Sequence, residues 1–261
     1  MARKFAQFLI PVLLLAFPLF ARDGLSKQEI LKKILERAKQ NEERVKQFGY
    51  YQSTDQKKMK DGKVTKEEHR SYRITWIQNQ PYLELLKFNG RDLDADARKK
   101  EADRKAKFVK SLSKKKEDAD DDDDITWDDL YAKFDFEQLP PDQNGAYVFS
   151  FKPKNEKLAN RSSTEKILNH LSGKFWTDNQ FNILGAEANL VEDVRFGFGI
   201  LGKVERLEIK YLQQTFDDAP LPSHLFISFK GRIALLKSEE GEIEATFKDY
   251  YRRPGARGGE N

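Results

Sequence analysis

The sequence predicts an α+β fold in which helices cover one face of an antiparallel β-sheet. Several late segments alternate between apolar and polar residues; Ile243, Ala245 and Phe247, for example, are separated by Glu244 and Thr246. This period of two indicates strands with one apolar and one solvated face, whereas strands of parallel sheets read as continuous apolar runs. One long amphipathic segment near the N-terminus can supply the helix that covers the apolar face.

The amphipathic segment is predicted to form a helix over residues 27–47. Ser26 and Glu29 have the spacing of a capping box, in which each side chain accepts a hydrogen bond from the other residue's backbone N–H. Apolar residues then recur at helical intervals as far as Val45, and Lys and Glu occupy the opposite face. Gly49 is a suitable stop signal for this helix.

The period changes to two after Gly49, where strands are expected to begin. Asp61-Gly62 is a strong hairpin dipeptide and separates the first two expected strands. In the second of them Tyr72, Ile74 and Trp76 fall on one face, because residues two apart in a strand point the same way.

The later part of the chain is mostly strand, and it contains three further helices. The expected elements are strands at 50–57, 64–77 and 82–88, an exposed helix at 94–112, a mobile charged loop at 113–124, a short helix at 125–134, a strand at 146–151, a short helix at 163–171, and strands at 174–177, 181–191, 204–216, 221–230, 232–238 and 242–251. Glu240-Gly241 and Gly231-Arg232 are expected turns between the last strands. Residues 253–261 are expected to form a disordered tail.

Composition excludes several classes of function. The 261 residues include no cysteine, which rules out a disulfide scaffold, a thiolate nucleophile and a cysteine zinc site. Lys and Arg number 47 against 43 Asp and Glu, and the net charge of +4 is too small to predict nucleic-acid binding. The 19 Phe, 9 Tyr and 3 Trp residues supply core material and argue against disorder over most of the length.

Residues 1–21 are predicted to be an export signal. Two basic residues precede a nearly continuous apolar run over 5–20, and Ala21 is a suitable small residue for cleavage. A membrane anchor is the alternative, but the run is about 16 residues, short of the roughly 20 that span a bilayer, and two prolines interrupt it. The mature chain is therefore expected to be exported, without a transmembrane span.

No motif of the chain identifies a catalytic centre. The glycines of residues 197–202 match the dinucleotide-binding pattern, but that pattern needs a following helix, and the next segment alternates like a strand, although a helical interpretation is possible. His69, His170 and His224 lack a metal-binding spacing, and the acidic run 120–124 lacks the glycine and glutamate of a calcium loop. We expect no cofactor, metal or enzymatic activity; a secreted hydrolase with a scattered site is a weaker alternative.

The order of elements resembles the periplasmic lipoprotein-carrier superfamily, typified by the localisation factors LolA and LolB and the sensor RseB. The residues that carry the resemblance, to a bacterial branch of this superfamily, are Tyr72-Arg73-Ile74-Thr75-Trp76, Pro81-Tyr82-Leu83 with Asn89-Gly90, Gly173-Lys174-Phe175-Trp176-Thr177-Asp178 before Ala186-Glu187-Ala188, Leu221-Pro222, Gly231-Arg232 and Asp249-Tyr250-Tyr251. The resemblance implies a single domain over residues 22–252, folded as an open, curved antiparallel sheet, an incomplete barrel, with helices covering the concave face. The helix at 94–112 and the loop after it depart from the simplest carriers.

The resemblance also implies a function. Members of this superfamily hold acyl chains or hydrophobic protein segments, so we expect a non-enzymatic periplasmic protein whose partner is a lipid or an acylated lipoprotein. An envelope protein-interaction or sensor module on the same fold, without lipid transport, is the alternative. The candidate lining of an apolar cavity comes from period-two counting on four strands and comprises Leu184, Leu190, Leu207, Ile209, Ile227, Phe229, Ile243 and Phe247. The same pattern fits an ordinary packed core, and the sequence leaves both interpretations open.

Export gives the first testable prediction. In a Gram-negative host the protein should be found in the periplasmic fraction, shortened by about 2 kDa through removal of roughly 20 residues. Fractionation and intact-mass measurement check this. An unshortened chain that remains with the inner membrane would contradict the predicted cleavage and favour the anchor.

Overall fold

One antiparallel sheet organises the protein. The computed structural model describes residues 24–78, 80–115, 126–141, 143, 145–154, 163–196, 202–233 and 237–254. Within these residues four helices accompany twelve strands, and all twelve strands belong to the same sheet. The expected α+β class is therefore confirmed.

The elements follow one another along the chain with short connections. The helices are α1 (Lys27–Val45), α2 (Ala95–Lys115), α3 (Trp127–Lys133) and α4 (Ser163–Leu168). The strands are β1 (Phe48–Lys60), β2 (Lys63–Ile77), β3 (Gln80–Phe88), β4 (Arg91–Asp92), β5 (Phe134–Leu139), β6 (Tyr147–Pro153), β7 (Leu171–Thr177), β8 (Ile183–Leu190), β9 (Val194–Phe196), β10 (Gly202–Phe216), β11 (Ala219–Ile233) and β12 (Lys237–Arg252).

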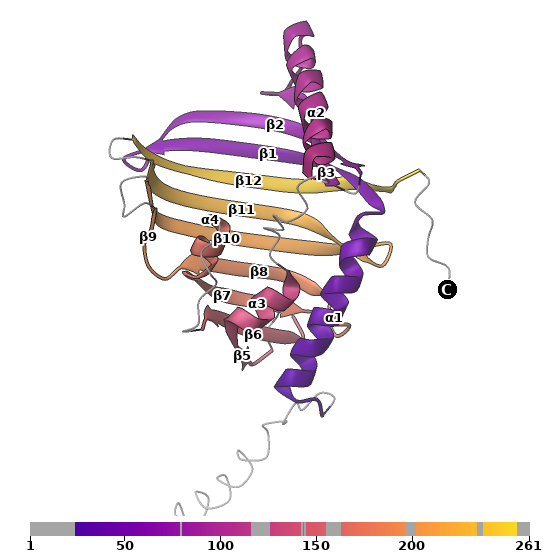
Figure 1. The fold of residues 1–261 in the computed structure, drawn as a ribbon, viewed down its shortest axis with the longest axis vertical. Coiled ribbons are helices and arrows are strands. Elements are labelled where there is room, and N and C mark those ends of the chain that lie inside the picture. The colour runs from indigo at the N-terminus through magenta and orange to yellow at the C-terminus, as the bar shows by residue number, and fades with distance from the viewer. Residues whose placement is uncertain are drawn as a thin grey trace, which may run out of the picture.

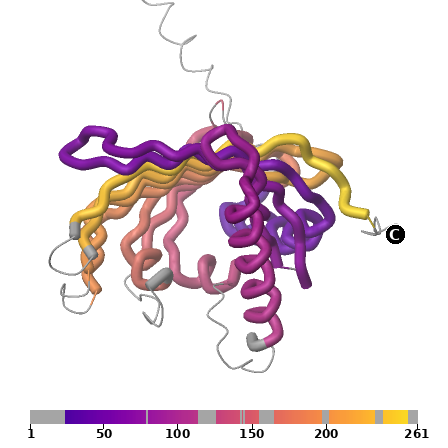
Figure 2. Tube along the Cα trace, turned by 90° about the horizontal axis from the view of Figure 1, so that it is seen from above, coloured from indigo at the N-terminus to yellow at the C-terminus, as the bar shows by residue number. Residues whose placement is uncertain are grey.

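The order of the strands joins the beginning of the chain to its end. It runs β4-β3-β2-β1-β12-β11-β10-β8-β7-β6-β5, with β9 paired to β10. The first hairpin therefore extends the sheet beyond β12 through an antiparallel β1–β12 ladder. The sheet stays open, with β4 and β5 at its two edges, and Figure 2 shows it curved like an arch with α1 on the inner side.

Helix α1 covers one end of the concave face. Its capping box forms as expected, with Ser26 and Glu29 exchanging hydrogen bonds at the first turn. Its buried side chains Ile30, Leu31 and Ile34 pack with Tyr147 and Phe149 of β6 in the main core cluster. Figure 1 shows the helix crossing one end of the strands, so it buries that end and leaves the rest of their length to other contacts.

Hydrogen bonds among polar side chains fix α1 to the turn between β7 and β8. We call the four residues that form them, Arg37, Asn41, Asp178 and Asn182, the Asn182 bracket. The side-chain oxygen of Asn182 accepts hydrogen bonds from Arg37 Nε at 2.7 Å and from Asn41 Nδ2 at 2.9 Å. The carboxylate of Asp178 positions Asn182. It accepts one hydrogen bond from the backbone N–H of Asn182 and one from its side-chain Nδ2, each at 2.8 Å. Asn41 and Asn182 are both buried, so these hydrogen bonds replace water that the two side chains have lost.

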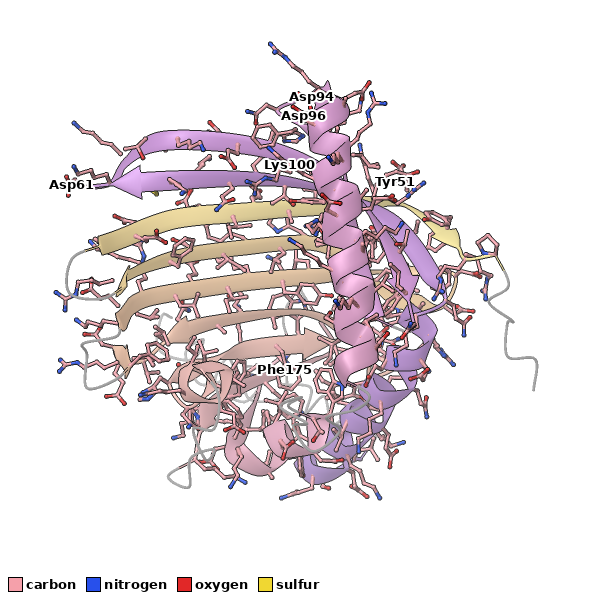
Figure 3. The ribbon with its side chains drawn as sticks, turned by 45° about the horizontal axis from the view of Figure 1, so that its top comes forward. Tyr51, Asp61, Asp94, Asp96, Lys100 and Phe175 are labelled. Atoms are coloured by element: carbon pink, nitrogen blue, oxygen red, sulfur yellow. The ribbon has the colours of Figure 1, made fainter. Side chains whose placement is uncertain are left out.

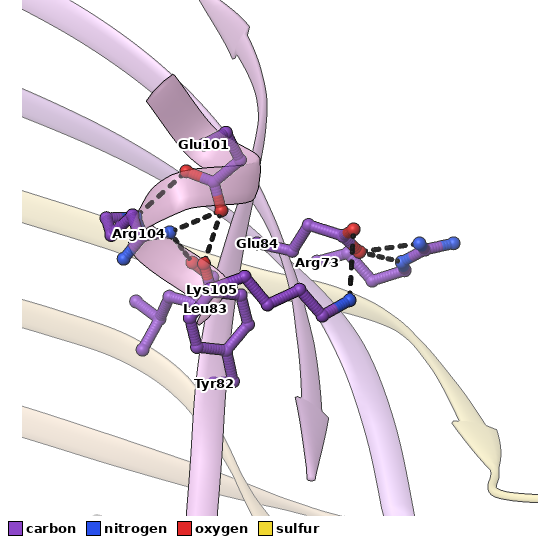
Figure 4. Close-up of polar contacts among 7 residues, drawn as sticks. All are labelled: Arg73, Tyr82, Leu83, Glu84, Glu101, Arg104 and Lys105. Carbon is purple, nitrogen blue, oxygen red and sulfur yellow. Dashed lines mark hydrogen bonds and ion pairs between the residues drawn. The ribbon is translucent and has the colours of Figure 1, made fainter. Parts of the chain in front are cut away.

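Helix α2 stands against the β3 edge of the sheet. Tyr82 of β3 is buried, and its hydroxyl donates a hydrogen bond to Glu101 at 2.7 Å. Arg104 pairs with Glu101 and donates to the backbone carbonyl of Leu83, as Figure 4 shows. Burial alone would raise the pKa of Glu101, but hydrogen bonds from Arg104 and Tyr82 lower it, so that this carboxyl stays ionised.

The local turn and face predictions for the first strands are confirmed. Asp61 and Gly62 have φ angles of 52° and 74°, the left-handed conformations that a two-residue hairpin turn requires. Tyr72 and Ile74 lie opposite Gln52 and Tyr50 respectively, on one face of β1 and β2. Figure 3 shows Asp61 at the free tip of this hairpin, far from Tyr51 at the other end of β1.

The two glycine turns expected near the C-terminus are wrong. Gly231 lies within β11 and Gly241 within β12, each paired on both sides. A Cβ on Gly241 would lie 2.5 Å from the carbonyl oxygen of Lys57, and one on Gly231 would lie 2.7 Å from that of Lys203. These glycines permit close approach between strands rather than reversal of the chain.

Other boundaries also differ from expectation. β5 and β9 are strands that the sequence did not predict, and α2 continues to Lys115, so the first three residues of the expected loop 113–124 are helical. The rest of that loop, the export signal 1–21 and most of the tail 253–261 lie outside the described residues.

The Asn182 bracket gives a prediction for stability. Asn182→Ala should lower the free energy of unfolding by about 1–3 kcal/mol, because it leaves buried donors on α1 without their acceptor. Urea denaturation measures the change. Asn189→Ala, on the exposed part of β8, is the matched control and should be near neutral; equal effects of the two substitutions would show that the bracket contributes nothing.

Candidate ligand-binding face

The register of the ladders aligns concave-face side chains in rows that cross the sheet. Phe149 marks the concave side because it packs against α1, and Phe175 lies opposite it on β7, facing the same side in Figure 3. The three rows, read from β6 towards β12, are Phe149–Phe175–Ala186–Tyr211–Leu225–Ala245, then Phe151–Gly173–Ala188–Ile209–Ile227–Ile243, then Leu171–Leu190 on β7 and β8 with Leu207–Phe229–Gly241 on β10 to β12. We call these side chains the apolar face.

Most of the predicted lining residues meet on this face. Ile209, Ile227 and Ile243 are directly opposite one another on β10, β11 and β12. Leu207 lies opposite Phe229 in the next row, and Leu190 has the same orientation on β8. The register thus assembles from separate strands the continuous apolar surface that period-two counting suggested.

Two predicted residues lie at the margin of the set. Phe247 lies on β12 opposite Gln52 of β1, and its ring contacts that of Tyr50 at a centroid distance of 5.8 Å. Leu184 lies where the β7–β8 register shifts between Trp176 and Thr177, an irregularity that the alternation of the sequence does not reveal.

The eight predicted lining residues are half-buried and lie outside the two core clusters next to α1. None of the eight is fully buried, whereas Phe48, Phe149 and Leu221 are fully buried in the two clusters next to α1. Within the described part of the chain, Figure 1 shows no helix over the middle of β10 to β12. These eight side chains are thus less completely buried than the clusters next to α1.

Sequence reasoning missed several members of the same rows. Phe175, Tyr211, Leu225 and Ala245 share the face with the predicted residues. Tyr211, Leu225 and Ala245 already alternate in phase with predicted neighbours on their own strands, so the signal was present. Phe175 belongs to the row only because β7 pairs with β8 and places it opposite Ala186. The sequence does not specify that pairing.

A hollow at one end of the face lies outside the predicted set. A pocket of about 540 Å³ is lined by Phe136, Phe151 and Gly173, together with polar residues of β5 to β7. Phe136 lies opposite Phe151, so this pocket opens where the rows reach the β5 edge. None of the eight predicted residues lines it; they form an open surface on the adjacent strands.

Three tyrosines lie together where the face approaches the C-terminal end of β12. The ring of Tyr50 is 5.7 Å from that of Tyr250, and Gln213 donates a hydrogen bond to the hydroxyl of Tyr211 at 3.0 Å. Burial raises the pKa of Tyr50 and Tyr211, and it raises that of Tyr250 to about 12. The neutral phenols thus add polar atoms to this end of the face.

The histidines and the glycine pattern do not form a site in the described residues. Each histidine pairs with one carboxylate: His69 with Asp55, His170 with Glu192 and His224 with Glu244. Among the residues that the structure describes, no group of three such side chains could hold a metal ion. Gly202 opens β10 and pairs with β9, so a strand follows the glycine pattern, whose other residues lie outside the described ranges.

Comparison with known proteins finds remote structural likenesses. No family model and no curated protein matches the chain. Solved structures that resemble it include a DUF1329 family protein from Desulfovibrio piger (TM-score 0.37, 11% identity, 88% of this chain and 94% of that one). Others are a domain given as a candidate outer membrane lipoprotein-sorting protein from Vibrio parahaemolyticus (0.37, 11%, 87% and 95%) and a LolA superfamily protein from Nitrosomonas europaea (0.31, 12%, 88% and 94%). At these TM-scores and identities the ligand has to be inferred from the chain's own concave face.

The buried tyrosines give a prediction about pH. Their pKa values are raised in the folded state, so the stability they confer is complete below pH 10 and is lost as the pH rises towards about 12. Tyr50→Phe should flatten the fall in the free energy of unfolding over this window, because Phe cannot ionise. Chemical denaturation at a series of pH values measures it, and an unchanged slope in the variant would contradict the assignment.

Proposed function

We propose that this protein is a non-enzymatic periplasmic binding protein that carries or senses a lipid or a lipidated protein, with the acyl chain lying on the apolar face. The observation that supports this most is the partial exposure of aligned apolar side chains on β8, β10, β11 and β12. A contiguous exposed apolar surface of this kind is typical of a binding site.

The energetics favour an acyl ligand. Each CH₂ group removed from water contributes about 0.8 kcal/mol. The proposed path of the acyl chain crosses the part of the apolar face on β7, β8, β10, β11 and β12. At about 4.8 Å per strand spacing these five strands cover about 19 Å, the length scale of an extended fatty acyl chain. Binding of this kind needs no reactive group, which agrees with the absence of a catalytic motif in the sequence.

The proposed compartment rests on the sequence. The signal-like residues 1–21 precede a mature chain that we propose forms one domain over residues 22–252. None of the helices in the part of the chain that the structure describes combines the length and apolarity needed to cross a bilayer. An aqueous compartment between two membranes is where a soluble acyl-chain binder would be useful.

Substitutions on β10 and β11 test the proposal. Ile209→Asn and Ile227→Asn should remain folded by circular dichroism, because the native side chains are only half-buried. Both should weaken binding of a fluorescent fatty acid by about tenfold, through loss of apolar contact and desolvation of the amide. Fluorescence titration measures the affinity.

The matched control lies on the same strand. Leu212→Asn replaces an exposed leucine on the opposite, convex face of β10 and should leave the affinity unchanged. If the wild-type protein never takes up the probe, or if the two isoleucine variants unfold, the surface is a core or a protein-docking face. The envelope interaction or sensor module then becomes the better account.

A further inference from the structure

The apolar face ends abruptly between β12 and β1. In each of the three rows the next residue after β12 is polar: Thr54 follows Ala245, Gln56 follows Ile243, and Lys58 follows Gly241. The partners on β2 continue the change, since these three residues lie opposite Arg70, Glu68 and Lys66 in turn. Over these three rows, a boundary parallel to the strands therefore divides the concave face.

The polar side of this boundary is positively charged. Lys58, Lys66 and Arg70 surround a single carboxylate, Glu68, and we call these four residues the basic strip. Glu68 forms ion pairs with Lys66 and Arg70, and Arg70 also donates to Gln56 at 2.9 Å. A hydrogen bond from Lys66 and the charges of Arg70 and Lys58 lower the pKa of Glu68, as expected in a locally positive environment.

Lys58 is the uncompensated charge of the basic strip. Glu68 accepts from both Lys66 and Arg70, whereas the ammonium group of Lys58 makes no hydrogen bond or ion pair within the described residues. It lies directly across β12 from Phe229, because Gly241 separates the two and Phe229 lies over that glycine. A cation and an apolar ring are thus neighbours across the boundary.

We propose that the basic strip binds the anionic head group of an amphiphile whose acyl chain lies on the apolar face. The inference rests on the proposed function and adds to it the chemistry and the orientation of the ligand: a carboxylate or a phosphate at β1 and β2, and the chain running across β12 towards β7. The charge complements an anion, and the boundary matches the junction between head and tail. A fatty acid and an acidic lipid share this chemistry.

A matched pair of probes separates the head from the tail. We compare an anthroyloxy-labelled stearic acid with its methyl ester, which has the same chain and no charge. Lys58→Gln should weaken binding of the acid about threefold, and the Lys58→Gln, Arg70→Gln double variant about tenfold, as expected for partly exposed ion pairs. Both variants should bind the ester like the wild type. Raising the ionic strength should weaken binding of the acid alone.

Controls use residues on the other face. Lys57→Gln changes the neighbouring lysine, whose side chain points to the convex side opposite Glu242 and Glu67, and it should alter neither affinity. Competition with unlabelled stearate and with lysophosphatidic acid distinguishes the two sources of the anion. Displacement by either one that depends on Lys58 supports the basic strip as the head-group site.

The outcomes distinguish the two proposals. If the wild type binds both probes and the Lys58 and Arg70 variants change the two affinities equally or not at all, the basic strip does not bind the head group, while acyl binding stands. If the wild type binds neither probe, the proposed function itself fails. Circular dichroism of each variant checks folding. The single variant Lys58→Gln removes no ion pair of the described residues, so it still tests the proposal if the double variant is unstable.

Discussion

The pairing of β1 with β12 is the contact on which the functional face depends. It joins residues some two hundred positions apart and requires close approach, since a Cβ on Gly241 would lie 2.5 Å from the carbonyl oxygen of Lys57. Its register decides which side chains of the first hairpin share the concave side. A shift by one residue would replace Thr54, Gln56 and Lys58 with their convex neighbours. The boundary between apolar and polar surface is therefore a property of this one ladder.

The position of α1 explains why part of the sheet remains open. A single helix of 19 residues can cover only one end of strands that are up to 16 residues long. It buries Phe149 and Phe48 at that end, and the bracket of Asn182 with Arg37 and Asn41 fixes it there. The rows farther along the strands keep their half exposure. Among the described residues, the two core clusters thus lie next to α1, and the proposed ligand contacts lie farther along the strands.

Local patterns predicted most of the secondary structure and the central part of the apolar face, but not the limits of that face. The alternation of apolar and polar residues on β10, β11 and β12 identified Ile209, Ile227 and Ile243, because each of these strands has one solvated face. The glycines at 231 and 241 were misread as turns because a glycine that reverses the chain and one that allows close approach look alike in sequence. The basic strip had no local signal at all. The half of the β1–β2 hairpin that carries Lys58 and Arg70 is polar on both faces, and only the pairing of β1 with β12 places these cations beside apolar residues.

Partial exposure has an energetic consequence that separates a binding face from a core. Apolar side chains left half in water forgo part of the burial free energy that folding would otherwise gain. A ligand that binds only the folded state recovers this contribution and stabilises the protein in proportion to its concentration and affinity. The apolar rows stop at β12, and the positively charged side chains of the basic strip lie on β1 and β2. A molecule with one apolar and one anionic end would therefore gain the most binding free energy from this face. The division of the sheet is therefore the basis on which we propose both the kind of ligand and the direction in which it lies.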